Sequence, residues 1–134
     1  MRVEIVELEK KKDHRGFLVQ YLTNSELKSK RFGTLYVVYI APKTVRACHF
    51  HKRKQEWSWV AYGKCKFVLQ NVRTKEKTEL ILDSSTDKIV RITIEPFVAH
   101  GIKNLSESAS IIIGYASEAY DPDDPDTYPY KLEL

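Results

Sequence analysis

Apolar and polar residues alternate in short runs along most of the chain, which has 134 residues. Successive side chains of a β-strand point to opposite faces, so a period of two predicts strands with one buried face. The runs with this pattern, or with continuous aromatic and β-branched residues, lie at 2–8, 17–22, 34–41, 44–51, 56–62, 65–71, 77–82, 89–94, 99–105 and 110–116. So many short strands at close spacing predict an all-β fold, an antiparallel sandwich or a small barrel.

The segments between these runs contain turn residues and very little helical pattern. Gly63-Lys64 is typical of a tight hairpin turn between two strands. Asn24 can cap one short helix over residues 24–28. Residues 121–130 are rich in proline and aspartate, so we predict that this tail is not a strand. Its aromatic residues predict that it packs across the body of the protein.

Length and composition are compatible with a single domain, residues 1–134, because 43% of the residues are hydrophobic and can form a core. The net charge of +4 suits an anionic ligand such as a nucleotide diphosphate, but it also suits an ordinary lysine-rich surface. The basic residues form no nucleic-acid-binding motif, and no apolar run approaches the length of a membrane span. We therefore expect a cytoplasmic protein with no nucleic-acid or membrane partner.

Two histidines separated by one residue mark the clearest candidate site. His49 and His51 lie in a predicted strand, where residues two apart share a face, whereas on a helix they would diverge by roughly 200°. Glu56 begins the next predicted strand and can lie beside His51, and His100 lies in a distant strand. Three imidazoles and a carboxylate can bind a divalent metal, with zinc expected first and iron, manganese, nickel or copper as alternatives.

At these positions the sequence resembles the cupins. The first cupin motif ends in HxH, four residues, Glu, six residues and Gly, and four residues have this spacing: His49, His51, Glu56 and Gly63. The second motif is approximated by Pro96, His100 and Asn104, with Phe97 where glycine is usual. The resemblance implies a double-stranded β-helix, a jelly-roll barrel with at most one short helix and one open end around the metal.

The same resemblance implies how the domain is organised. Residues 1–43 would form N-terminal strands and a dimerisation region, and residues 44–117 would form the barrel core with both motifs. Residues 118–134 would be a tail that packs on the barrel. The chain would then act as a homodimer.

Within the cupins, the chain resembles the nucleotide-sugar branch. Residues 13–17 (Asp-His-Arg-Gly-Phe) resemble the Asp-x-Arg-Gly-x-Phe element of the dTDP-4-dehydrorhamnose 3,5-epimerases. Residues 46–49 (Arg-Ala-Cys-His) resemble their Arg-Gly-Leu-His, in which the histidine is the catalytic base and the arginine contacts phosphate. Those epimerases use no metal and carry glutamine at the position of His51. Their catalytic tyrosine corresponds to Gly114, and the nearest tyrosine, Tyr115, falls on the opposite face of the strand.

Two other groups are similar to parts of the chain. Residues 116–128 resemble the end of the C-terminal cupin domain of a capsular-polysaccharide reductase/epimerase that acts on UDP-2-acetamido-2,6-dideoxyhexuloses. That domain binds zinc and epimerises at C3. Residues 46–52, with residues 116–118, are similar to the dTDP-4-keto-6-deoxyglucose 3,4-ketoisomerases. These resemblances imply an epimerase or ketoisomerase for a dTDP- or UDP-linked 4-keto-6-deoxy sugar in surface-polysaccharide biosynthesis.

Proton removal next to a ketone needs a base and a group that stabilises the enolate oxygen. One imidazole cannot both hold a metal and take a proton. If all four ligands hold a metal, the base is another residue: Tyr36, Tyr39, Tyr115 or His14. If the site is metal-free, His49 is the base.

The expected catalytic residues are therefore His49, His100, Tyr115 and Tyr39. The expected substrate-binding residues are Arg15, Arg46 and Tyr36, although either arginine can equally be a surface ion pair. Two other functions stay open at this point, a non-catalytic metal- or sugar-binding cupin and a metal-dependent dioxygenase.

Overall fold

The computed structural model describes residues 1, 3–27 and 31–134. This part of the chain contains the strands β1 (Glu4–Leu8), β2 (Lys11–Asp13), β3 (Gly16–Leu18), β4 (Thr34–Ile40), β5 (Val45–Phe50), β6 (Glu56–Tyr62), β7 (Lys64–Asn71), β8 (Lys77–Asp83), β9 (Ile89–Ile94), β10 (Val98–Asn104), β11 (Ser110–Ala116) and β12 (Tyr128–Pro129). A single 3-10 turn, η1, spans Asn24–Glu26. The all-β prediction is confirmed, and no described helix is long and apolar enough to cross a membrane.

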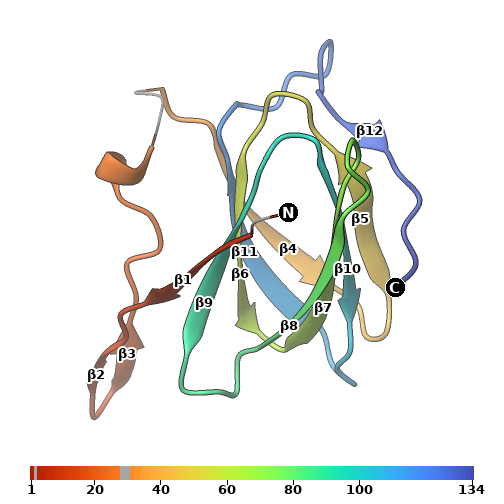
Figure 1. The fold of residues 1–134 in the computed structure, drawn as a ribbon. Coiled ribbons are helices and arrows are strands. Elements are labelled where there is room, and N and C mark those ends of the chain that lie inside the picture. Colours follow the sequence, from red (N-terminus) through yellow and green to blue (C-terminus); the bar gives the residue numbers. More distant parts are fainter. Residues whose placement is uncertain (2, 28–30) are drawn as a thin grey trace.

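The strands form two antiparallel five-stranded sheets that face each other (Figure 1). The first sheet has the order β1-β9-β6-β11-β4, and the second sheet has the order β12-β5-β10-β7-β8. From β4 to β7 and again from β8 to β12, consecutive strands lie in opposite sheets. Strands that are distant in sequence therefore become neighbours. β2 and β3 form a separate hairpin that projects from the body of the molecule (Figure 1).

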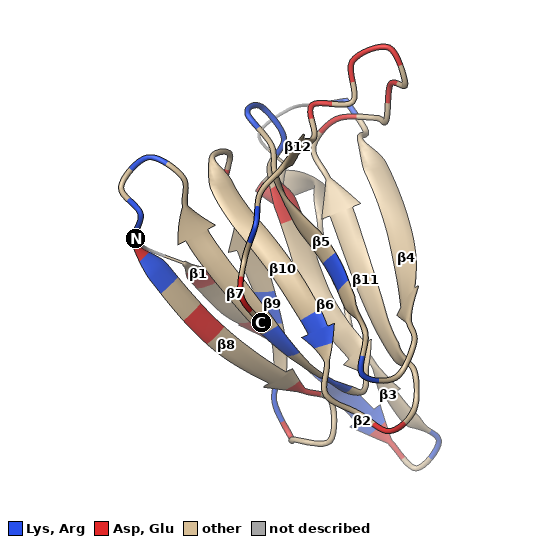
Figure 2. Cartoon of the chain, turned by 90° about the vertical axis from the view of Figure 1, so that its right-hand side faces the viewer, with Lys and Arg blue, Asp and Glu red and all other residues tan. Residues whose placement is uncertain are grey.

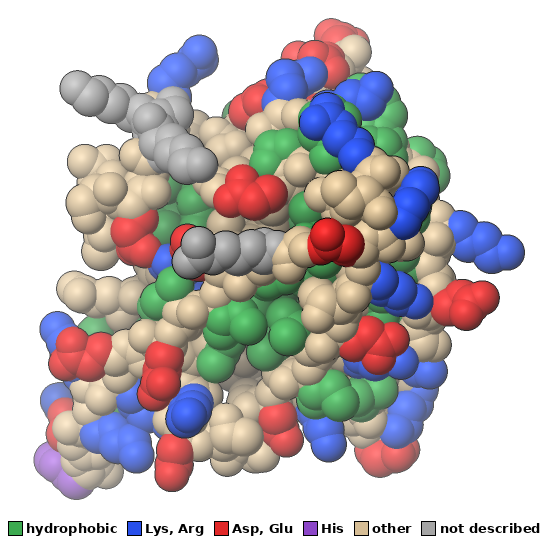
Figure 3. Space-filling view, in the orientation of Figure 1, with side chains coloured by type: hydrophobic (Ala, Val, Ile, Leu, Met, Phe, Trp, Pro, Cys, Tyr) green, Lys and Arg blue, Asp and Glu red, His purple; other side chains and the backbone are tan. Residues whose placement is uncertain are grey.

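The hydrophobic core fills the space between the two sheets. Its buried members are Ile40, Val60, Cys65, Phe67, Leu69, Ile92, Ile94, Val98, Ile102 and Ile112. Hydrophobic side chains also gather in the middle of the molecular face in Figure 3, with charged side chains around them. Because side chains alternate between the two faces of a strand, each sheet contributes one layer of buried side chains to the core. The two layers together support the site residues.

The N-terminal segment covers part of the outer face of the first sheet. The ring of Tyr21 stacks on Trp59 at a centroid distance of 5.9 Å. The buried guanidinium of Arg91 bonds the Glu26 carboxylate and the Tyr21 carbonyl, both at 2.5 Å. Residues 19–22 belong to this covering segment and are not part of a strand. The predicted strand at 17–22 is therefore wrong after Leu18, where β3 ends.

Three further local predictions differ from the structure. Gly63-Lys64 does not form a hairpin, because β6 and β7 lie in different sheets. The helical turn ends at Glu26, earlier than predicted, and its N-cap is Thr23 instead of Asn24. The predicted strand at 2–8 and the predicted helix at 24–28 also include Arg2 and Lys28, which lie outside the described residues. The tail contains the short strand β12, because the edge of β5 offers it backbone partners.

Gly63 turns the chain from one sheet to the other, with a φ of 107°. A Cβ at this position would collide with the side chain of Ser110. That side chain cannot yield freely, because the fully buried Ser110 hydroxyl donates to the Asn104 carboxamide oxygen at 2.7 Å. Glycine is therefore required both by the backbone conformation and by the close approach.

We predict that Gly63→Ala lowers the free energy of unfolding by about 2 kcal/mol more than Gly16→Ala, since only the first adds a clash to an unfavourable φ. Gly16 is a matched control, because its φ is 131° but nothing lies within 4 Å of an added Cβ. Urea denaturation of both variants measures the difference. Equal losses for the two variants would contradict the argument.

Candidate functional site

Three histidines meet between the two sheets. β5 pairs with β10 so that His49 lies directly opposite His100. The ring centroid of His49 is 4.7 Å from that of His100 and 4.9 Å from that of His51. One ring nitrogen of each histidine lies within 4.8 Å of one from each of the others, so this cluster could hold a metal ion. We call the space around it the cup.

Glu56 reaches the same point from the first sheet, where it begins β6. Its Oε1 lies 3.2 Å from Nε2 of His51, and its Oε2 lies 3.2 Å from Nε2 of His100. The side chains of all three residues are nearly buried. The structure therefore brings together the four residues predicted as metal ligands.

Backbone carbonyls fix the orientation of two of the imidazoles. Nδ1 of His51 lies 2.6 Å from the Asp126 carbonyl oxygen, and Nδ1 of His100 lies 3.1 Å from that of Val98. A carbonyl only accepts hydrogen bonds, so each Nδ1 carries a proton, and in the neutral ring each Nε2 presents a lone pair. The buried Nε2 of His51 has no well-directed hydrogen bond among the described residues. These two nitrogens fit a divalent metal, because metal-binding histidines commonly donate their other N–H in this way.

His49 differs from the other two histidines. It is half-buried, and its ring has no hydrogen-bond partner within the described part of the chain. Burial, followed by the nearby imidazoles of His100 and His51, lowers its pKa from 6.5 to about 4. The ring is therefore neutral near pH 7 and has a nitrogen free to accept a proton or to bind a metal.

The charge of Glu56 balances the cup. Burial alone would raise the pKa of this carboxyl, but interactions with His100 and His51 outweigh burial and lower the pKa well below its ordinary range. For His51, burial lowers the pKa, and the Glu56 carboxylate beside Nε2 raises it by more. The carboxylate is thus ionised, and the cup favours a bound cation.

A β-bulge in β5 puts the exposed Arg46 on the same face of the strand as His49. His100 pairs with His49, but the next residue of β10, Gly101, pairs with Ala47. Ala47 and its neighbour Cys48 have φ values of 68° and 62°, which accommodate the extra residue. Arg46 consequently pairs with Ile102, a core residue, and so lies on the inner face of the sheet with His49. The sequence pattern alone would put a residue three positions from His49 on the outer face.

A glycine on β11 makes room for a tyrosine from β4. Tyr36 pairs with Gly114, and an added Cβ at Gly114 would collide with the phenol ring of Tyr36. The phenol reaches the Ser58 hydroxyl, which belongs to the residue on the other side of Gly114. Burial and the charge of Glu56 raise the pKa of Tyr36, so the phenol keeps its proton.

Other predicted site residues lie elsewhere. Tyr39 is exposed on the outer face of β4. Tyr115 lies on the outer side of β11, where its ring packs on Trp57 and its hydroxyl accepts the Gly33 N–H at 2.6 Å. The structure does not bring either tyrosine to the cup, because each lies one residue out of phase with the inner face.

Two further predicted residues lie in the exposed β2–β3 hairpin. Arg15 pairs with Asp13 at 2.6 Å, and its neighbour His14 is exposed as well. The hairpin projects from the body of the molecule, so neither side chain reaches the cup of its own chain (Figure 1).

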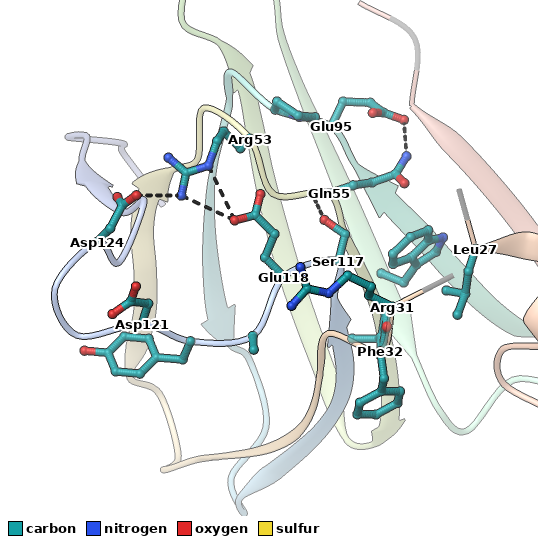
Figure 4. Close-up of a pocket in the computed structure, with 15 residues that line it drawn as sticks. Leu27, Arg31, Phe32, Arg53, Gln55, Glu95, Ser117, Glu118, Asp121 and Asp124 are labelled. Atoms are coloured by element: carbon teal, nitrogen blue, oxygen red, sulfur yellow. Dashed lines mark hydrogen bonds and ion pairs between the residues drawn. The ribbon is translucent and has the colours of Figure 1, made fainter. Parts of the chain in front are cut away.

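A cavity of about 750 Å³ lies outside the cup, beside Trp57 and Tyr115 (Figure 4). At its rim the Arg53 guanidinium lies 3.1 Å from Asp124 and 3.3 Å from Glu118. Because the neighbouring carboxylates already engage Arg53, the rim is poorly suited to bind a diphosphate. The arrangement of titratable groups therefore favours the cup as the functional site.

Comparisons with known proteins agree with this fold. Residues 11–128 match a protein family described as the polysaccharide biosynthesis C-terminal domain. The spore coat polysaccharide biosynthesis protein SpsL of Bacillus subtilis is 28% identical over 127 residues, which is 92% of this chain and 84% of that protein.

A UDP-2-acetamido-2,6-beta-L-arabino-hexul-4-ose reductase of Pseudomonas aeruginosa is 28% identical over 116 residues. The match covers 87% of this chain but only 29% of the reductase. The crystal structure of a dTDP sugar isomerase from Desulfovibrio desulfuricans is similar over 98% of this chain and 85% of its own, with a TM-score of 0.84 and 17% identity. This structural likeness confirms the cupin-like fold that the sequence resemblance implies.

The lowered pKa of His49 predicts how stability depends on pH. The unfolded imidazole titrates near 6.5 and the folded one near 4, so between these values the unfolded chain binds more protons. We expect this residue to make the metal-free protein less stable as the pH falls through that window. Urea denaturation at both ends of the window, in the presence of a chelator, measures the loss.

His49→Gln is the control for this prediction, because it removes the shifted group and leaves Glu56 and the other histidines in place. The variant should lose less stability than the natural protein over the same window. A loss of the same size in both proteins would show that the pKa of His49 does not differ between the folded and the unfolded chain.

Proposed function

The chain belongs to the family of polysaccharide biosynthesis C-terminal domains, and from this premise we propose that it is a nucleotide-sugar epimerase or ketoisomerase. Its substrate would be a dTDP- or UDP-linked 4-keto-6-deoxy sugar, and its reaction would begin with proton removal from the carbon next to the ketone. The names of its relatives support this substrate class, since they include a hexul-4-ose reductase and a dTDP sugar isomerase.

A divalent metal, zinc first, would be held by His51, His100 and Glu56. Supporting this set, both Nε2 atoms carry lone pairs in the neutral rings and lie 3.2 Å from the two oxygens of Glu56. Three protein ligands with an open position are typical of catalytic metal sites. Bound there, the metal would polarise the ketone as a Lewis acid.

His49 would be the base. Its ring lies next to the two buried imidazoles but lacks the carbonyl bond that fixes each of them. Its lowered pKa keeps it neutral, so it can take the proton from the carbon beside the ketone. The C–H electrons then form the enolate, and the imidazole becomes an imidazolium.

Tyr36 would be the proton donor. Its raised pKa keeps the phenol protonated, and it belongs to the first sheet, across the cup from the histidine strands. Delivery of a proton to the opposite face of the same carbon inverts that carbon, which is epimerisation. When that carbon carries a hydroxyl, transfer of the hydroxyl proton to the enolate oxygen and delivery of a proton to the former carbonyl carbon move the ketone, which is ketoisomerisation.

Arg46 would bind the diphosphate. The β-bulge puts it on the inner face of β5, and its side chain is exposed. An arginine can donate two parallel hydrogen bonds to a phosphate, which would anchor the nucleotide beside the histidines. The observation that carries the whole proposal is the convergence of His49, His51, His100 and Glu56 in one cup.

Deuterium exchange tests the proposed reaction. In D2O, the protein should introduce deuterium at the carbon beside the ketone of dTDP-4-keto-6-deoxyglucose or of its UDP-linked counterpart. His49→Gln should slow this exchange by about 10²–10⁴-fold, since it removes the base. Tyr36→Phe should slow product formation more than exchange. NMR and mass spectrometry measure both rates.

Tyr62→Phe is the matched control, because this tyrosine is exposed at the far end of β6 and should leave both rates unchanged. Binding of these nucleotide sugars without deuterium exchange would contradict the proposed reaction and favour a non-catalytic binding cupin.

We also propose that the protein is a homodimer that pairs through β4. This edge strand contains no charged residue, and its outward side chains Leu35, Val37 and Tyr39 are 58%, 67% and 68% exposed (Figure 2). Natural proteins protect exposed edges with charges, as β8 does with Lys77 and Glu79 at an edge of the second sheet. A second copy of β4 would cover the unprotected edge, and twofold symmetry makes that contact self-complementary.

We predict that Val37→Glu converts the dimer into a monomer, because it puts two like charges at the proposed contact. Ile81→Glu on β8 is the control, since Ile81 is 59% exposed and lies away from β4. Sedimentation velocity gives the masses. A natural protein that sediments as a monomer at all concentrations would refute the dimer.

A further inference from the structure

One residue of the tail holds two parts of the cup at once. The carboxylate of Asp126 is 1% exposed and accepts three backbone N–H groups, from Lys52 at 3.0 Å, Arg53 at 2.9 Å and Lys54 at 3.0 Å. The carbonyl oxygen of the same residue lies 2.6 Å from Nδ1 of His51. Asp126 thus bonds both to the ring of His51 and to the turn that follows it.

The conformation of Asp126 suits this double role. Its φ of 51° lies in the left-handed region, which a residue other than glycine adopts only when its surroundings require it. Burial alone would raise the pKa of this carboxyl, but the three N–H bonds and the charge of Arg53 lower it. The buried charge is therefore stabilised mainly by the backbone of the turn, and it depends on the shape of that turn.

Neighbouring contacts fix the tail against β5. The ammonium of Lys54, a buried residue, donates to the Pro125 carbonyl at 2.9 Å. On the other side of Asp126, Tyr128 pairs with Phe50 in the β12–β5 ladder, and their rings stack at 5.4 Å. The segment is thus attached before, at and after Asp126, so its carbonyl cannot move independently of His51.

We propose that Asp126 is a positioning residue that sets the tautomer and direction of His51. By holding Nδ1–H on its carbonyl, it directs Nε2 toward Glu56. Its carboxylate also binds the N–H groups of residues 52–54 and so fixes the turn between His51 and Glu56. The shape of this turn sets the distance between the side chains of His51 and Glu56 in the cup. This inference rests on the proposed metal site for its consequence, but the orientation of His51 can be measured without metal.

Asp126→Asn keeps the volume of the side chain but replaces one accepting oxygen by a donor, which faces backbone N–H groups. We expect the apparent Kd for Zn²⁺, measured by competition with a chromophoric chelator, to rise by about 10–100-fold. Asp123→Asn is the matched control, because Asp123 is exposed in the same tail and should leave the Kd unchanged.

NMR of the metal-free protein gives a readout that a loss of stability alone would not change. In alkaline buffer the natural protein should hold His51 as the Nδ1–H tautomer, and Asp126→Asn should populate both tautomers. A mixed tautomer in the natural protein would overturn the inference even if the variant failed to fold. So would a folded Asp126→Asn protein with unchanged tautomer and unchanged Kd. If the natural protein has the fixed tautomer but binds no zinc, the proposed metal site fails and the positioning of His51 stands.

Discussion

The buried carboxylate of Glu56 is the constraint on which the rest of the site depends. A negative charge between two sheets is costly unless partners stabilise it, and here the Nε2 atoms of His51 and His100 face its two oxygens at 3.2 Å. In the neutral rings the backbone carbonyls hold both Nδ1–H groups and each Nε2 presents a lone pair to the carboxylate, an imbalance that protonation of the rings or a bound cation relieves. A divalent cation would satisfy all of these groups together. This imbalance links the orientation of the histidines to the proposed chemistry.

The two sheets make this arrangement possible because each supplies a different chemical part. The second sheet contributes the three imidazoles and Arg46, through the β5–β10 pairing and its bulge. The first sheet contributes the carboxylate and the phenol of Tyr36, which passes over Gly114. The proposed base, His49, and the proposed proton donor, Tyr36, thus come from opposite sheets. Such an arrangement suits a reaction in which a proton leaves one face of a sugar and returns to another position.

Strand alternation was enough to predict an all-β fold. The spacing of His49, His51 and Glu56, together with the resemblance to the second cupin motif at His100, predicted the convergence of the four residues. Local patterns could not predict Arg46 or Tyr36 in their observed places, because the bulge and the gap at Gly114 depend on neighbouring strands. The hairpin predicted at Gly63-Lys64 was wrong for the same reason. A glycine that turns the chain from one sheet to the other has the same local sequence as a hairpin turn. Tyr115 was a candidate because it is next to the position of the epimerases' catalytic tyrosine, and Tyr39 was one by residue type. The phase of each on its strand puts both side chains on outer faces.

The most direct test is the metal content of the natural protein and of His49→Gln, His51→Gln and His100→Gln, each expressed in zinc-supplemented medium and measured by mass spectrometry. We expect about one divalent ion per chain in the natural protein and in His49→Gln, with strong loss in the other two variants. Absence of metal from the natural protein, or equal loss in all three variants, would contradict the division of the cup into metal ligands and a free base.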